Sequence, residues 1–124
     1  MTRRLLSLFL IASAGASLCA CATPSRFEWG GYESSLYAYA KKPERRMDYR
    51  ASLELAVDKG RKTDRVAPGL LAELGYLYLE DGDAAHAIPL FEEEMRRFPE
   101  SKSFLTSVVA RAQKSTTASV EVKS

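Results

Sequence analysis

The residues with the most specific chemistry are Leu18, Ala20 and Cys21, which end an apolar run near the start of the chain. Two arginines precede the run and small residues fill its far end, which is the three-part layout of a secretory signal peptide. A cysteine directly after a small residue matches the bacterial lipobox, in which the thiol takes a diacylglycerol and the chain is cut before it. The pattern predicts cleavage after Ala20 and a lipid on Cys21, since a cut before Cys19 would place Leu18 where a small residue is required.

An uncleaved transmembrane helix is the alternative, because Leu5–Ala22 approaches the roughly 20 apolar residues that a bilayer span needs. Polar and small residues dilute this run and favour the lipid anchor (Ser7, Ser13, Gly15 and Ser17). Ala22 stands where an aspartate is the usual signal for retention in the inner membrane. The sequence therefore predicts attachment to the outer membrane, with the periplasmic face as the commoner orientation.

Removal of residues 1–20 changes the charge balance and the cysteine count. The full chain has 18 Lys+Arg and 16 Asp+Glu, and Arg3 and Arg4 leave with the signal peptide. The mature chain is then formally neutral, which removes the electrostatic argument for binding nucleic acid. Cys19 departs as well and lipidation uses Cys21, so no thiol is left for a disulfide or a metal site.

The rest of the mature chain has helical patterning and no strand pattern. Residues 22–26 form a short tether, and residues 27–32 form an aromatic segment with two glycines. We predict a helix from residue 33 to about residue 42, and a second over 44–59 with Gly60 as its C-cap and 61–65 as a loop. Residues 114–124 are rich in serine, threonine and lysine, which predicts a disordered tail.

The stretch Pro68–Ser101 follows the degenerate pattern of the tetratricopeptide (TPR) repeat, roughly 34 residues long. Small residues stand where two antiparallel helices approach, and larger apolar residues stand beside them. The predicted packing residues are Leu71, Leu74, Gly75, Tyr78, Ala87, Phe91 and Pro99. The spacing predicts a helical hairpin.

The linker and second helix of this hairpin carry their own signals. Gly82 can adopt a positive φ in the turn, and Asp83 can cap the next helix. Pro89 predicts a local bend. Glu94 replaces the usual alanine, which either opens one side of the packing or marks a repeat without a close neighbour there. The charged run 92–97 is interpreted as a solvated face.

Repeats of this kind need neighbours to bury their apolar faces. One period back gives a degenerate repeat, with Lys41 breaking the pattern (Tyr37, Leu53 and Val57). One period forward gives a final helix with Ser101 as its N-cap (Leu105, Val108 and Ala112). The predicted fold is all-α, with TPR-like antiparallel helical hairpins and about five helices over residues 33–113, behind the signal peptide.

The lipobox, the Trp29-Gly30-x-Tyr32 segment and the stretch 76–88 together resemble a family of small bacterial lipoproteins catalogued as "domain of unknown function 4810". The resemblance covers Cys21 to about Ala112. Members are often encoded beside a CsgG-like lipoprotein and another small lipoprotein. The resemblance therefore implies protein partners, other lipoproteins among them, in an envelope assembly, and it implies no activity.

The sequence offers little for catalysis. His86, the only histidine, lies in the first turn of a predicted helix with no visible partner to orient it. Asp81 and Asp83 faintly suggest calcium, but the further ligands of a calcium loop are missing, and a turn with a helix cap is the favoured interpretation. We expect no catalytic residue, no metal and no cofactor apart from the covalent lipid.

Four aromatic residues near the anchor are the candidate partner-binding residues: Trp29, Tyr32, Tyr37 and Tyr39. They could pack on the first helix pair, lie in the membrane interface or contact a partner. We predict a non-catalytic, outer-membrane-anchored TPR-like adaptor that binds a protein in the cell envelope. The alternative is an envelope lipoprotein that binds a ligand or peptidoglycan through these aromatics.

Overall fold

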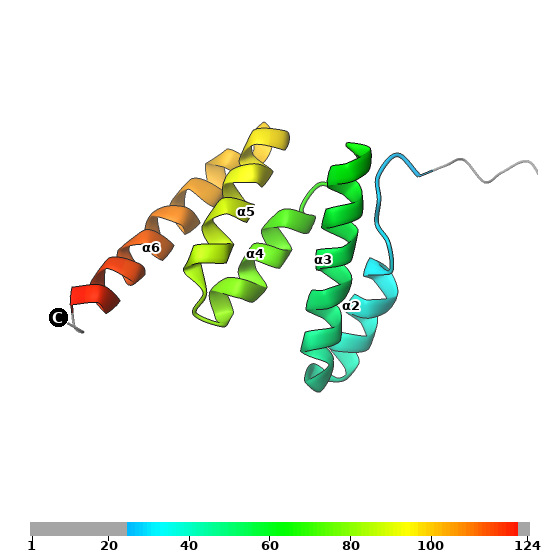
Figure 1. Ribbon diagram of the computed structural model, residues 1–124, viewed down its shortest axis with the longest axis horizontal. Coiled ribbons are helices and arrows are strands. Elements are labelled where there is room, and N and C mark those ends of the chain that lie inside the picture. The colour runs from blue at the N-terminus through cyan, green and yellow to red at the C-terminus, as the bar shows by residue number, and fades with distance from the viewer. Residues whose placement is uncertain (1–24, 122–124) are drawn as a thin grey trace, which may run out of the picture.

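The computed structural model describes residues 25–121, and side chains over residues 25–115. It contains five α-helices within that range (Figure 1): α2 (Tyr32–Lys41), α3 (Arg46–Thr63), α4 (Leu70–Glu80), α5 (Ala84–Arg97) and α6 (Lys102–Glu121). Short 3-10 turns precede α3 and α6, namely η2 (Pro43–Arg45) and η3 (Pro99–Ser101). The prediction of an all-α fold with about five helices is confirmed. The predicted signal peptide and Cys21 lie outside the described residues.

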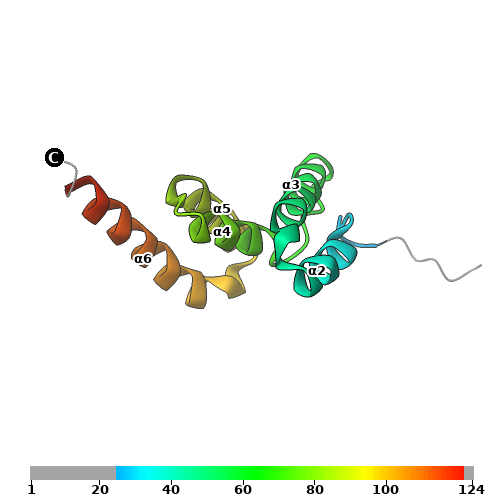
Figure 2. The same ribbon diagram turned by 90° about the horizontal axis from the view of Figure 1, so that it is seen from below.

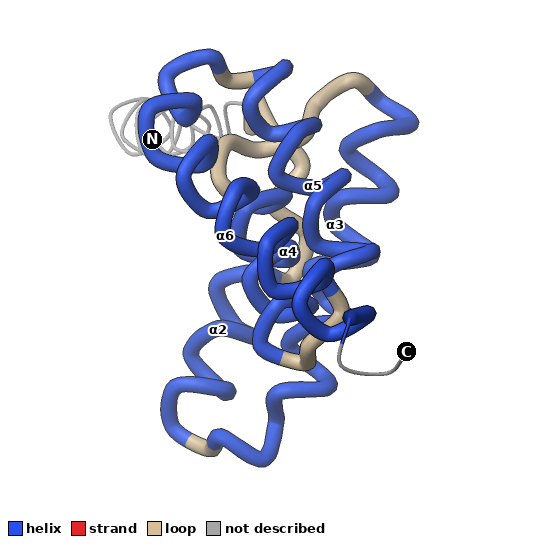
Figure 3. Tube along the Cα trace, turned by 90° about the vertical axis from the view of Figure 1, so that its left-hand side faces the viewer, coloured by secondary structure: helices blue, strands red, loops and turns tan. Residues whose placement is uncertain are grey.

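Helices form most of the described trace, with loops between them, as Figure 3 shows. The one extended pairing between residues 25 and 121 is an isolated parallel bridge between Glu28 and Val66, where the Glu28 N–H donates to the Arg65 carbonyl at 2.8 Å. This bridge holds the segment before α2 against the loop after α3. None of the helices over residues 25–121 has the length and apolar character needed to cross a bilayer.

The helices stand in a row, and neighbours in the sequence are neighbours in space (Figures 1 and 2). Helix α2 packs on α3, α3 on α4, α4 on α5, and α5 on α6. Two apolar clusters fill this row. The first joins α2, α3 and α4 with Leu90 of α5, and its buried members include Tyr49, Leu53 and Leu71. The second joins α4, α5 and α6, and its buried members include Phe91 and Leu105.

The α4–α5 hairpin has the geometry that the spacing predicts. Gly75 faces the ring of Phe91, and a Cβ at Gly75 would lie 2.7 Å from Phe91 Cε1. In the connecting turn, Gly82 has φ 77° and the Asp83 side chain accepts from the His86 N–H at 3.1 Å. The predictions of a close approach, a positive φ and an aspartate cap are confirmed. Helix α5 continues across Pro89, and the predicted local bend stays a prediction.

The predicted end of the second helix is wrong. Gly60 lies inside α3, which continues to Thr63, and the left-handed residue that ends the helix is Asp64 with φ 52°. Gly60 serves a packing purpose instead, because a Cβ there would lie 2.8 Å from Val66 Cα. The chain needs a glycine at this point so that the loop can return closely along the helix.

The packing position predicted for Tyr37, in the degenerate repeat one period back, is also wrong. Tyr32, Leu36 and Tyr39 face the core, whereas Tyr37 is 64% exposed. Tyr37 and Lys41 are four residues apart and therefore share one face of the helix. The Lys41 ammonium lies 5.0 Å from the centroid of the Tyr37 ring. The Lys41 ammonium keeps this face of the helix in water. The face with Tyr32, Leu36 and Tyr39 therefore packs on the core.

The final helix extends further than predicted. Leu105, Val108 and Ala112 are buried as expected, but α6 continues to Glu121, so the prediction of a disordered tail is wrong for residues 114–121. The first turn of a helix fixes several dihedral angles for one hydrogen bond, whereas each added residue gains one hydrogen bond for its own two dihedral angles. A polar sequence can therefore extend a helix that has already formed. Ser101 belongs to η3, and its hydroxyl donates to the Phe98 carbonyl at 2.8 Å, which is not the predicted N-cap bond. Residues 122–124 lie outside the described residues.

Candidate functional site

The aromatic residues near the N-terminus form a continuous series of ring contacts. Ring centroids are 6.4 Å apart for Phe27 and Trp29, 5.8 Å for Trp29 and Tyr32, 6.3 Å for Tyr32 and Tyr49, and 5.2 Å for Tyr49 and Tyr39. Phe27, Tyr32 and Tyr39 pack on the first apolar cluster, as the interpretation of a cap on the first helix pair predicts. Of the four candidate partner-binding residues, only Trp29 and Tyr37 are exposed.

Glu73 of α4 ties this aromatic series to the next helix pair. The Tyr32 hydroxyl donates to Glu73 Oε2 at 2.8 Å, and the buried Tyr49 hydroxyl donates to Oε1. Burial and the adjacent carboxylate raise the pKa of both phenols, so both stay protonated as donors at neutral pH. No local pattern in the sequence indicates this role of Glu73, because Tyr49 and Tyr32 precede it by 24 and 41 residues and lie on other helices.

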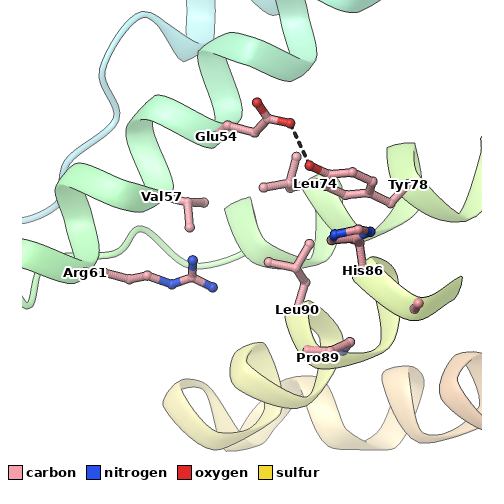
Figure 4. Close-up of a pocket in the computed structure, with 9 residues that line it drawn as sticks. Glu54, Val57, Arg61, Leu74, Tyr78, His86, Pro89 and Leu90 are labelled. Atoms are coloured by element: carbon pink, nitrogen blue, oxygen red, sulfur yellow. Dashed lines mark hydrogen bonds between the residues drawn. The ribbon is translucent and has the colours of Figure 1, made fainter. Parts of the chain in front are cut away.

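A cleft of about 300 Å³ opens between α3 and the α4–α5 hairpin (Figure 4). Its apolar lining comes from three helices, with Val57 on α3, Leu74 on α4 and Leu90 on α5. The other lining residues are Glu54, Arg61, Tyr78, Ala85, His86 and Pro89. Figure 4 shows Glu54 at one end of the cleft and Arg61 at the other.

Polar groups at the Glu54 end are held by one another. The Tyr78 hydroxyl donates to Glu54 Oε1 at 2.7 Å, and this bond together with burial raises the pKa of Tyr78. The His86 ring stacks on Tyr78 with centroids 5.2 Å apart. His86 Nδ1 lies 2.6 Å from Asp83 Oδ2, so the expectation that His86 lacks an orienting partner is wrong. The bonds from His86 lower the pKa of Asp83.

At the other end, an ion-pair network connects α3 to α5. Glu93 pairs with Arg61 of α3 and, at 2.9 Å, with Arg97 of its own helix. Arg97 also reaches Asp64 at 3.1 Å. The two guanidinium groups, Arg61 foremost, lower the pKa of Glu93. Of this network, Arg61 lines the cleft.

Glu94 is the exception to the interpretation of residues 92–97 as a solvated face, since it is only 2% exposed, whereas Glu92 and Arg96 are exposed as predicted. Its Oε1 accepts from the Gly69 N–H at 2.7 Å, at the start of α4, where backbone donors have no partner within the helix. The carboxylate therefore fills the space of the usual alanine and caps a neighbouring helix. Burial raises the pKa of Glu94, against the opposing effect of the α4 amide groups.

A pH-dependent prediction follows for Glu94. A carboxyl whose pKa is raised by folding stabilises the fold most below its unfolded pKa, and that contribution is lost as pH rises through the folded pKa. Glu94→Gln, which resembles the protonated form, should therefore gain stability relative to the unsubstituted protein between pH 4 and pH 7. Glu94→Ala should cost about 1–3 kcal/mol, because it leaves buried donors unpaired.

Urea unfolding at a series of pH values measures both effects. Glu92→Gln is the matched control, because Glu92 is exposed on the same helix and should show neither change. A relative stability of Glu94→Gln that is constant over this pH range would contradict the buried, protonation-sensitive carboxyl.

The arrangement is suited to binding. An apolar floor with polar groups at both ends is typical of a site that accepts a side chain or short peptide. Within residues 25–121, no group of three or more histidine, cysteine, aspartate or glutamate side chains is placed to hold a metal ion. Tyr78 holds Glu54 and stacks on His86, while Arg61 pairs with Glu93 beside the cleft.

Comparison with known proteins gives one finding. The family model described as "Domain of unknown function (DUF4810)" matches residues 27–108. This range begins at the aromatic segment and ends within α6, so it includes all residues that line the cleft. No curated protein and no solved structure gives a significant match.

Proposed function

The chain belongs to the family described as "Domain of unknown function (DUF4810)", and on that premise we propose that it is a non-catalytic adaptor that docks a partner protein. The observation that carries the proposal is the cleft between α3 and the α4–α5 hairpin, with its apolar floor and polar ends. Clefts of this kind are the usual places where a folded surface takes a protruding side chain. A partner would insert a side chain here and spread over the helices beside it.

We extend the proposal to a TPR-like arrangement of the helices. Support comes from the α4–α5 hairpin, where the close contact of Gly75 with Phe91 stands at the positions that the repeat pattern requires. The pairs before and after it continue the row of helices. In such arrays each repeat contacts only its neighbours, which leaves extended surfaces for partners.

The proposed location is the outer membrane, with a lipid on Cys21 and the folded part on the periplasmic face. Support comes from the lipobox and from the absence of aspartate at position 22. Several acyl chains on one residue anchor a protein far more firmly than one, since each buried CH₂ contributes about 0.8 kcal/mol. Partners would then be envelope proteins, and the CsgG-like lipoproteins implied by the family resemblance are the first candidates.

Crosslinking in living cells tests the adaptor proposal. A photoreactive amino acid at His86, on the rim of the cleft and with a 68% exposed side chain, should yield a defined product with another protein. The same amino acid at Lys41 and at Lys102 samples surfaces away from the cleft. If none of the three positions yielded a product with another protein, the adaptor proposal would be contradicted.

The exposed indole of Trp29 provides a test against the rival of peptidoglycan binding. Tyr32 and Tyr39 are packed on the core, so Trp29 would have to supply the stacking surface with Tyr37, the other exposed member of the four. We expect Trp29→Ala to leave the crosslink from His86 at an unchanged yield. Loss of peptidoglycan pull-down in Trp29→Ala, with the crosslink retained, would instead assign a glycan-binding role to this residue.

A further inference from the structure

The floor of the cleft has the dimensions and chemistry for one long side chain. Its volume of about 300 Å³ is at the small end of the range for ligand pockets, roughly 300–1,000 Å³. Val57, Leu74 and Leu90 offer apolar surface along the path between Glu54 and Arg61 (Figure 4). An occupant with an aliphatic stem would replace water on this floor, while a whole helix would not fit within the volume.

The charge around the cleft is unequal at its two ends. The ion-paired group of side chains at the Glu54 end has three carboxylates and two guanidinium groups (Glu54, Glu80, Asp81, Arg46 and Arg50), and the carboxylate of Asp83 nearby pairs with His86. The network at the Arg61 end has two carboxylates and two guanidinium groups (Glu93, Asp64, Arg61 and Arg97). The excess of negative charge at one end favours a cation there.

One acceptor at this end has capacity for a further donor. Within residues 25–121, both contacts of the Glu54 carboxylate, from Tyr78 and from Arg50, are made by Oε1. With Oε1 in use, Oε2 offers a single oxygen, which suits a compact ammonium better than a guanidinium, whose flat fork matches both oxygens of a carboxylate.

We propose that the cleft receives a lysine side chain of the partner protein, with its aliphatic stem on Val57, Leu74 and Leu90 and its ammonium at Glu54. The proposal rests on the proposed adaptor function and names the chemistry that the partner must present. An acetylated lysine would keep the stem but lose the charge, so it would occupy the cleft less well.

Zero-length coupling tests this contact directly. A carbodiimide joins a carboxylate to a primary amine only when the two are in contact, and it can be applied to envelopes that contain the full-length protein. Mass spectrometry of the coupled peptides should find Glu54 joined to a lysine of a different polypeptide. The variant Glu54→Gln should lower the yield of that partner conjugate at least tenfold. Glu33→Gln, an exposed glutamate on α2, should leave the yield unchanged.

The outcomes separate this proposal from the adaptor function. A partner captured from His86 without any Glu54–lysine product would overturn the lysine proposal and leave the adaptor intact. Coupling of Glu54 to a lysine of a second copy, recognised by mixing isotope-labelled and unlabelled protein, would also overturn it. Loss of all photocrosslinks would contradict both. Glu54→Gln keeps an acceptor for Tyr78, and an unchanged thermal melt should confirm that the variant folds.

Discussion

Gly75→Leu is expected to lower the free energy of unfolding of the mature chain by about 3 kcal/mol, at the upper end of overpacking costs. Even the first side-chain carbon would lie 2.7 Å from Phe91 Cε1, and Phe91 is fully buried, so the ring has little room to move away. A leucine forms helix better than glycine by somewhat less than 1 kcal/mol, which offsets only part of the loss. Urea unfolding followed by circular dichroism measures the change.

The control for this substitution is Gly31→Ala. Gly31 has φ −90°, and a Cβ there would meet nothing closer than the Ser52 hydroxyl at 3.6 Å. Gly31 is the N-cap of α2, where alanine is less favourable than glycine, so the unfolding free energy should fall by about 1 kcal/mol at most. If Gly75→Leu were as stable as Gly31→Ala, the close contact between α4 and α5 would be disproved.

Phe91→Ala is the second substitution with a large expected effect. Phe91 is 0% exposed and joins α4 to α6 through the second apolar cluster, which includes Leu105 and Val108. Removal of a buried aromatic ring of this kind costs about 3–5 kcal/mol, because the cavity closes only partly. That loss is comparable to the whole stability of many small domains, so the array should be largely unfolded at moderate temperature.

The double variant Gly75→Leu/Phe91→Ala gives a sharper test of the same contact. The leucine would occupy part of the space that the ring vacates, so the two losses should not add. Contacting residues commonly show interaction energies of about 0.5–3 kcal/mol in such cycles. Additive losses in this cycle would mean that the two residues do not touch.

Local sequence patterns were sufficient to predict the helices and the contact between α4 and α5 in the hairpin. Gly75, Phe91, Gly82 and Asp83 are defined by short spacings within one hairpin, and helical periodicity carries the same information for the final helix. These features depend on neighbours a few residues away. The structure therefore agrees with the prediction at the places where the physics is local.

The failures have non-local causes. Glu94 is charged, and a charged residue in a run of charges normally faces water. Its burial depends on the start of α4, 25 residues earlier, where free backbone N–H groups offer a partner. Gly60 looked like a helix cap because its real contact, Val66, belongs to a loop whose path was not known.

The cleft could not be predicted for the same reason. Its lining extends from Glu54 to Leu90 and comes from three helices, so no single motif contains it. The His86–Asp83 pair was the one accessible signal, since an aspartate cap places its carboxylate beside the side chain three residues later. That spacing indicates the partner of His86 but not the cleft beside it.

The account depends most on a lipid at Cys21, because the anchor decides which proteins the helices can meet. The most direct measurement is the fraction of Cys21→Ser that sediments with membranes after a high-salt wash, combined with the intact mass of the protein. We predict that Cys21→Ser remains an unprocessed precursor without added lipid. Cys19→Ser should mature, carry the acyl mass and sediment with membranes as the unsubstituted protein does. A mature Cys21→Ser that keeps the acyl mass and its place in the membrane fraction would contradict the account.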